Sequence, residues 1–196
     1  CLAHATLISF NNYPGWYGYP GDVSAPKKVW TEEANHVRAG TTSSGAGTLG
    51  KPFVVSETGA GGLFEWDANA TDAKWTLKYQ SEIILNDVDV AITNGNISGI
   101  TLWHFFDFKV DNGGQQENNT HCTYDHPPPT TFEELAQVGP PNCTSFGEVG
   151  SRPGGENHKG SLDFWRREKP AFALVAAKYK ALHAAQHEQN RYTVVV

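Results

Sequence analysis

KPFVVSETGA, residues 51–60, is the stretch that decides the fold: a short apolar run ends at the acidic residue Glu57 and is followed by glycine. The run is apolar almost throughout rather than alternating, which is typical of a buried strand in a parallel sheet covered on both faces. Two other runs have the same character, ATLISF at residues 5–10 and ITLWHF at residues 100–105. Together they predict three parallel strands.

Each apolar run is followed by a polar stretch rich in Gly or Asn and then by a helical pattern. The spacing of apolar residues predicts helices over Pro26–Arg38, Ala73–Thr93 and Pro170–Ala185, the last with proline in its first turn. Strand followed by helix, repeated three times, indicates an α/β fold. Because three strands are few for a free-standing parallel sheet, we expect this chain to be part of a larger (β/α) barrel.

A long insertion, rich in Gly, Pro and Asn, runs from Lys109 to Lys169. Loops of this length within a compact domain are usually functional, and in a barrel this one would lie on the C-terminal face, where active sites are built. We therefore expect a partial catalytic barrel over residues 1–187, with a loop insertion at 109–169 and a C-terminal tail at 188–196. Since the chain begins with Cys1 and contains no methionine, we expect a fragment or a processed piece.

Charge and cysteine content narrow the classes of partner and the compartment. The net charge of -6 argues against nucleic acid, which needs a basic face, and no apolar stretch is long enough to span a membrane. Cys122 and Cys143 either remain free thiols or close a loop of about 20 residues, worth roughly 3 kcal/mol. A disulfide and four Asn-x-Ser/Thr sequons favour a secreted or secretory-lumen protein. The sequons begin at Asn69, Asn96, Asn118 and Asn142.

Glu57 is the first candidate for chemistry, because a carboxylate at the end of a buried strand is held on a rigid element. The glycines that follow it leave space for a ligand. Retaining glycoside hydrolysis needs such a fixed carboxylate, facing a second carboxylic acid about 5–5.5 Å away. The alternative interpretation is that Glu57 caps the loop or pairs with an arginine.

Aromatic residues follow the first and third predicted strands at the same end of the sheet. Tryptophan faces stack on sugar rings, and tyrosine hydroxyls reach sugar hydroxyls or a nucleophilic carboxylate. Each residue taken singly is as well explained by packing, but their arrival at one end together with Glu57 favours a sugar site. They are Tyr13, Trp16, Tyr17, Tyr19, Trp103 and His104.

Four segments, in this order, resemble the last three barrel strands of glycoside hydrolase family two, which contains β-glucuronidases, β-galactosidases and β-mannosidases. They are NNYPGWY at residues 11–17, KPFVVSETGA at 51–60, LWHFFDF at 102–108, and RPGGENHKG at 152–160 followed by RREKP at 166–170. The resemblance reaches to about residue 182 and implies the C-terminal portion, about strands 6–8 with their helices, of a (β/α)8 TIM barrel.

The resemblance also implies roles for residues that match the motifs. Glu57 looks like the family nucleophile. Tyr13 and Tyr17 look like the pair that lines the sugar site, and Trp103 looks like the platform under the bound sugar.

A second motif bears on the substrate. In β-glucuronidases an Asn-x-Lys motif in the loop after the eighth strand holds the substrate carboxylate, and Asn157 and Lys159 match it. Arg152 resembles an arginine nearby in those enzymes, although its spacing to Asn157 is one residue longer here. A lysine and an amide supply the cation and donor that a uronate needs. The alternative is that Lys159 is a solvated loop lysine.

One departure from the family is an absence: its general acid/base, a Glu preceded by Asn at the end of the fourth strand, has no counterpart, since this sequence contains no Asn-Glu dipeptide. The expected function is that of a retaining exo-β-glycosidase, a β-glucuronidase first and a β-galactosidase as the nearest alternative. A non-catalytic carbohydrate-binding remnant is the alternative from another class. We expect carbohydrate as the partner and neither a metal nor an organic cofactor, and a homo-oligomer of the full-length protein stays open.

Overall fold

A parallel sheet of three strands forms the centre of the protein. The computed structural model describes residues 4–40, 50–64, 74–109, 122–123, 142–143 and 156–192. The sheet has the order β1 (Ile8–Asn11), β2 (Phe53–Thr58), β3 (Gly99–Leu102). The main helices are α1 (Ala25–Ala39), α2 (Leu77–Thr93) and α4 (Pro170–Tyr192). The predicted α/β organisation with parallel strands is therefore confirmed.

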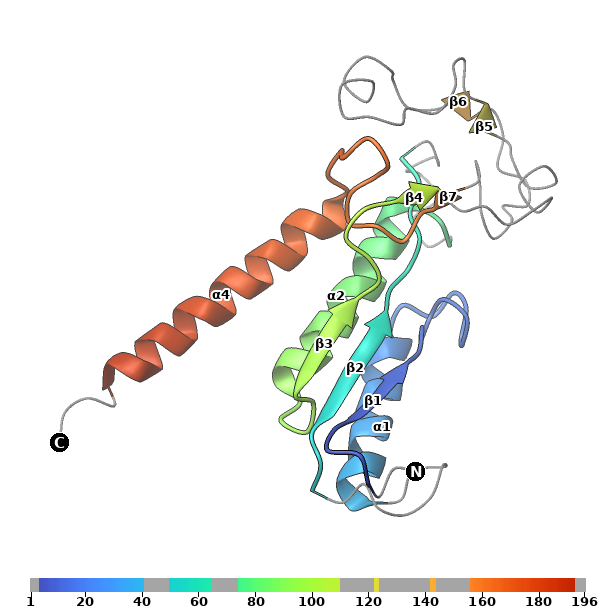
Figure 1. The fold of residues 1–196 in the computed structure, drawn as a ribbon. Helices are drawn as coiled ribbons and strands as arrows, with labels where there is room; N and C mark the ends of the chain where they lie inside the picture. Colours follow the sequence, from blue (N-terminus) through green and yellow to red (C-terminus); the bar gives the residue numbers. More distant parts are fainter. Residues whose placement is uncertain are drawn as a thin grey trace.

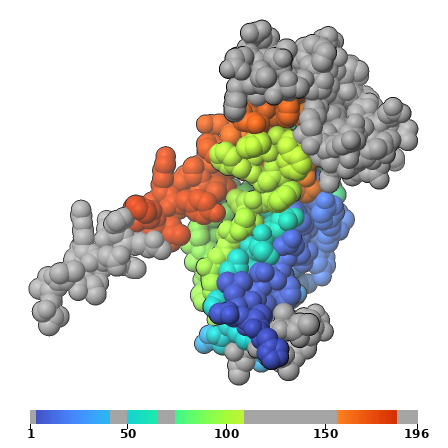
Figure 2. Space-filling model, viewed as in Figure 1, coloured from blue at the N-terminus to red at the C-terminus, as the bar shows by residue number. Residues whose placement is uncertain are grey.

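Helices α1 and α2 lie together on one face of the sheet, and α4 packs on α2 and extends away from it (Figure 1). The sequence predicted a sheet covered on both faces. Within the described residues, however, helices cover only one face, and in Figure 2 the strands form part of the molecular surface from blue through cyan to green. The described helices therefore bury the apolar side chains on only one of the two faces of these strands.

The boundaries of the helices differ from the prediction by more than one residue at two places. The second helix begins at Leu77 rather than at Ala73, because Thr76 is its N-cap and accepts a hydrogen bond from the N–H of Tyr79 at 3.1 Å. The third helix continues past Ala185 to Tyr192. None of the helices in the described part of the chain is long and apolar enough to cross a bilayer.

The predicted insertion contains short antiparallel pairs where it is described. Strand β4 (Phe108–Lys109) pairs with β7 (Glu156–Asn157), and β5 (Cys122–Thr123) pairs with β6 (Asn142–Cys143). Cys122 lies directly opposite Cys143 in the backbone register of the second pair. This register suits the disulfide, which stays a prediction.

The main core lies between the sheet and α1. Phe53 and Val55 point from β2 towards Trp30 and Ala34 of α1, and all four are buried. The apolar residues whose spacing predicted α4 are only partly buried: Val175 packs against α2, whereas Tyr179 is 42% exposed. The physical reason is that α4 leaves α2 after its first turns (Figure 1).

A fully buried carboxyl, Asp87 of α2, connects this core to the end of β2. It accepts hydrogen bonds from the indole N–H of Trp30 at 2.8 Å and from the hydroxyl of Thr58 at 3.1 Å. Burial raises the pKa of Asp87 to about 7, although both hydrogen bonds favour the ionised form. The residue that follows Glu57 is thus tied to helix α2.

Because the folded state raises the pKa of Asp87, folding retains a proton there that the unfolded chain has lost above pH 4. The contribution of Asp87 to stability is therefore greatest below its unfolded pKa and decreases as the pH rises to about 7, by on the order of 4 kcal/mol. We expect Asp87→Asn to remove this decrease, because its amide oxygen can accept from Trp30 while its NH₂ donates to the Thr58 hydroxyl, which then acts as acceptor. Urea unfolding from pH 4.5 to 8 measures it, as the difference between wild type and variant.

Asp89→Asn, on the same helix but in an ion pair with Lys178 at 2.7 Å at the surface, is the matched control. It should keep the wild-type dependence of the unfolding free energy on pH. An equal pH slope in wild type and Asp87→Asn would show that Asp87 does not titrate in this range.

Candidate active site

Glu57 lies in β2 at a β-bulge that turns its side chain away from the helices. The register of β2 shifts against both neighbours around Ser56, between Phe53–Val55 and Thr58. Val55 points into the helix-side core and Thr58 bonds to Asp87 of α2, so alternation along the strand places Glu57 on the opposite face. Bulges commonly re-aim a side chain beside an active site.

The carboxylate of Glu57 is held by two residues from β1 and the loop after it. The hydroxyl of Tyr13 donates to Oε1, and the amide of Asn11 donates to Oε2 at 3.1 Å. Ser56 in turn donates to Oδ1 of Asn11 at 2.7 Å, which orients the amide. Both carboxylate oxygens are thus fixed and half-buried, while the alternative roles, loop cap or arginine pair, are not observed among the described residues.

Lys159 is buried, with 3% of its surface exposed, and its ammonium lies among aromatic rings. Its Nζ donates to the hydroxyl of Tyr17 at 3.1 Å and lies 5.5, 5.2 and 5.1 Å from the ring centroids of Tyr13, Trp16 and Tyr17. A desolvated cation over aromatic faces is stabilised by their quadrupoles. Lys159 is therefore not a solvated loop lysine, and Tyr13 links it to Glu57.

Trp103 stands at the end of β3, beside the end of β2. Its backbone N–H donates to the backbone carbonyl of Thr58 at 2.7 Å, and 37% of the residue's surface is exposed. Gly59, with φ +153°, lies so close that a Cβ there would overlap the carbonyl oxygen of Trp103. The aromatic contacts of Trp103 within the described residues are with His104 and Phe108, at the same end of the sheet as Glu57.

Asn157 is buried in β7, opposite Phe108 of β4. Its side-chain oxygen accepts the N–H of Lys159 at 3.2 Å, and its side chain also bonds to His104. Burial lowers the pKa of His104, with the hydrogen bond to Asn157 acting in the opposite direction, so the imidazole is neutral at physiological pH. Arg152, the remaining predicted site residue, lies outside the described residues.

A buried polar cluster supports the loop of Lys159, and sequence reasoning missed it. Lys169 pairs with Asp107, Nζ lying 2.9 and 2.8 Å from the two carboxylate oxygens, and Asp107 also contacts the ring of His158 at 3.2 Å. Burial by itself raises the pKa of Asp107, but the charge of Lys169 and the hydrogen bond with His158 outweigh it and hold the pKa below its usual range. Asp107 is therefore an ionised partner of Lys169.

Asp107, Glu156 and His158 also have the residue types of a metal site, with ligand atoms within 4.8 Å of one another. The ammonium of Lys169 already occupies both oxygens of Asp107. A dication in the same place would face that positive charge, so we interpret the cluster as a structural ion-pair network rather than a metal centre.

Comparison with solved structures finds this fold in a β-galacturonidase and in β-glucuronidases. A GH2 β-galacturonidase from Eisenbergiella tayi, bound to galacturonate, matches with a TM-score of 0.62 and 24% identity, over 92% of this chain and 25% of that chain. The Faecalibacterium prausnitzii β-glucuronidase matches with a TM-score of 0.61 and 16% identity, over 92% and 22%. The β-glucuronidase of Bifidobacterium dentium, complexed with coumarin-3-O-glucuronide, has a TM-score of 0.60 and 17% identity, over 91% and 21%.

The resemblance to glycoside hydrolase family two indicated by the sequence motifs is thereby confirmed at the level of the fold. This chain spans about a quarter of the length of these solved structures. No protein-family model matches the sequence, and no curated protein matches it.

Proposed function

We propose that this chain is the nucleophile-bearing part of a retaining exo-β-glycosidase of glycoside hydrolase family two that hydrolyses β-glucuronides. The observation that carries the proposal is the pairing of a fixed carboxylate, Glu57, with a buried cation, Lys159, through the shared neighbour Tyr13. In this proposal β1, β2 and β3 are about strands 6–8 of a (β/α)8 barrel within a domain of residues 1–187. The fold shared with GH2 enzymes supports this placement.

Glu57 acts as the nucleophile in this mechanism. It attacks the anomeric carbon from the side opposite the leaving group and forms a covalent glycosyl-enzyme, which water then hydrolyses. Asn11 and Tyr13 orient its carboxylate for attack. A second carboxylic acid must protonate the leaving oxygen and then activate the water. The family motif for that residue is missing from this sequence.

Lys159 binds the substrate carboxylate in this mechanism. A uronate that approaches its ammonium replaces lost hydration with a charge-assisted hydrogen bond, which is strong where water is excluded. Asn157 and Tyr17 flank Lys159, Trp103 stacks on the sugar ring, and Arg152 is a further proposed contact. The uronate preference is supported by the solved neighbours, two of which are bound to galacturonate and to coumarin-3-O-glucuronide.

The proposal also includes the cellular compartment in which the protein acts. Four sequons and the register of Cys122 opposite Cys143 support a secreted or secretory-lumen protein.

Trapping the covalent intermediate tests this function directly. A 2-deoxy-2-fluoro-β-glucuronyl fluoride carries a leaving group that needs no protonation, so the complete gene product should be inactivated without help from the acid/base. We expect mass spectrometry of the digested protein to find one sugar on the peptide that contains Glu57. A label on another residue, or none after inactivation, would rule out Glu57 as the nucleophile.

A further inference from the structure

The backbone on both sides of Lys159 is held by side chains and strand ends from four parts of the protein. The carbonyl of Lys159 itself accepts the N–H of His104 at 3.1 Å. Before it, the carbonyl of His158 accepts hydrogen bonds from the N–H of Gly62 and from Nζ of Lys169, both at 3.0 Å. After it, the N–H of Gly160 donates to the Asp107 carboxylate at 2.7 Å, and the carbonyl of Gly160 accepts from the amide of Gln80 at 3.0 Å.

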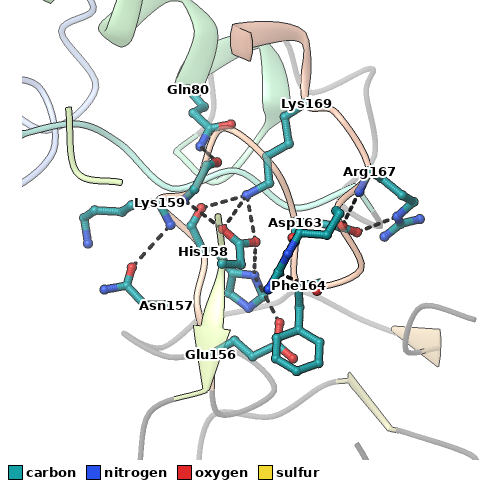
Figure 3. Close-up of polar contacts among 12 residues, drawn as sticks. Gln80, Glu156, Asn157, His158, Lys159, Asp163, Phe164, Arg167 and Lys169 are labelled. Carbon is teal, nitrogen blue, oxygen red and sulfur yellow. Dashed lines mark hydrogen bonds and ion pairs between the residues drawn. The ribbon is translucent and has the colours of Figure 1, made fainter. Parts of the chain in front are cut away.

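Two of these contacts come from one buried ion pair. Lys169 and Asp107 are each 1% exposed. Lys169 binds the carbonyl before Lys159, and Asp107 binds the N–H after it. The pair therefore brackets Lys159 on the side away from the aromatic rings, and Figure 3 shows the Lys159 side chain extending away from Lys169.

The contacts of Gly160 show how closely the loop of Lys159 packs against Asp107. A Cβ at Gly160 would overlap the backbone nitrogen of Asp107 and the carbonyl oxygen of Leu162. The loop thus lies directly on the carboxylate and on the backbone next to it, without an intervening side chain that could adjust. A change in the ion pair must move the loop backbone itself.

The buried ion pair adds little net stability to the folded state, because the desolvation of two charges offsets most of their attraction. It does fix geometry, since each charged group points at a defined backbone atom. When such a support already holds a binding cation in place, little free energy is lost in ordering the cation as its anion binds.

We propose that Asp107 and Lys169 are positioning residues that hold Lys159 in register with the substrate carboxylate, so that the ion pair determines affinity for uronides rather than the rate of bond cleavage. This inference rests on the proposed function of Lys159. It assigns a role to two residues whose hydrogen bonds run to each other and to the backbone on either side of Lys159.

The test is the double variant Asp107→Asn/Lys169→Met in the complete gene product, because removing both charges leaves no uncompensated buried charge. We expect KM for a β-glucuronide to rise on the order of tenfold to a hundredfold with kcat changed far less, since small misplacements of a binding group have effects of this size. Competitive inhibition by free glucuronate should weaken by the same factor, and inhibition by glucose should stay unchanged.

Lys178→Met is the matched control, because Lys178 lies on α4, the helix that begins directly after Lys169, and also pairs with an aspartate, Asp89 at 2.7 Å, away from the loop of Lys159. It should leave both inhibition constants at their wild-type values. Should the double variant fail to fold, Asp107→Asn alone decides, since its side-chain oxygen can still accept from Gly160 while the ion pair with Lys169 and the contact with His158 are weakened. An unchanged ratio of glucuronate to glucose inhibition in the folded variant overturns the proposal.

Lys159→Met separates failure of this inference from failure of the proposed function. If Lys159→Met loses glucuronate affinity and the ion-pair variants do not, only the positioning role is wrong. If Lys159→Met itself keeps glucuronate affinity, the proposed uronide function is wrong, and the positioning role is overturned with it.

Discussion

Glu57→Gln is expected to lower kcat for a chromogenic β-glucuronide by on the order of 10⁴- to 10⁶-fold, the range found when a covalent nucleophile is removed. The amide is nearly the size of the carboxylate and still accepts a hydrogen bond from Tyr13, so the fold and KM should change little. Its neutral oxygen, however, cannot form the glycosyl-enzyme. The initial rate of aglycone release, compared with the circular dichroism of the same preparation, measures the effect.

The stereochemistry of a rescued reaction makes this prediction specific to a nucleophile. In Glu57→Ala, azide can enter the space left by the carboxylate and attack the anomeric carbon from the same side. We expect azide to restore turnover of an activated β-glucuronide and to give the α-glycosyl azide, detected by nuclear magnetic resonance. A β-configured product, or hydrolysis by Glu57→Gln at the wild-type rate, would show that Glu57 has another role.

Glu82→Gln provides the matched control for this substitution. Glu82 lies on α2 in an i,i+4 pair with Lys78, and 35% of its side chain is exposed. The change removes the same charge from the protein without altering the site. We expect kcat to remain at the wild-type value, which attributes the loss in Glu57→Gln to the position and not to the net charge.

The sequence predicted the strand that carries Glu57 and the tyrosines next to it, because both follow from local pattern. A run such as residues 51–60 must be buried, and the parallel order brings its end beside the end of the first strand. The contact between Tyr13 and Glu57 then follows from proximity. The family resemblance added the roles, which periodicity alone does not contain.

The bulge at Ser56 and the ion pair of Asp107 with Lys169 escaped prediction for physical reasons. A bulge is a property of the pairing between strands, and the amino-acid sequence of one strand does not specify it. A lone Asp or Lys is normally solvated, so its burial cannot be inferred before its partner is known. Asp107 and Lys169 are 62 residues apart, and only the fold brings them together.

The same separation explains why Lys159 could be read as a solvated residue. Its three aromatic neighbours lie in the segment after β1, far away in the sequence. The motif of Asn157 and Lys159 supplied the residues of a uronate site, but their burial comes from packing against Trp16 and its neighbours. Burial matters to the chemistry, because a hydrated ammonium discriminates poorly between a carboxylate and water.

Lys159→Met is expected to lower kcat/KM for a β-glucuronide by on the order of 10²- to 10³-fold, the effect of removing one partner from a desolvated charge pair. Methionine keeps the unbranched stem that packs on the aromatic rings, so the loss reports the charge. A β-glucoside differs from the glucuronide only by a hydroxymethyl group in place of the carboxylate, and its kcat/KM should change little. Lys74→Met is the matched control, because Nζ of Lys74 lies 4.3 Å from the Trp16 ring centroid and 6.0 Å from that of Tyr17, two of the three rings that surround Lys159. If Lys159→Met lost glucuronide, glucoside and galactoside turnover equally, the lysine would support the fold of the site instead of reading the carboxylate, and a β-galactosidase would become the better interpretation.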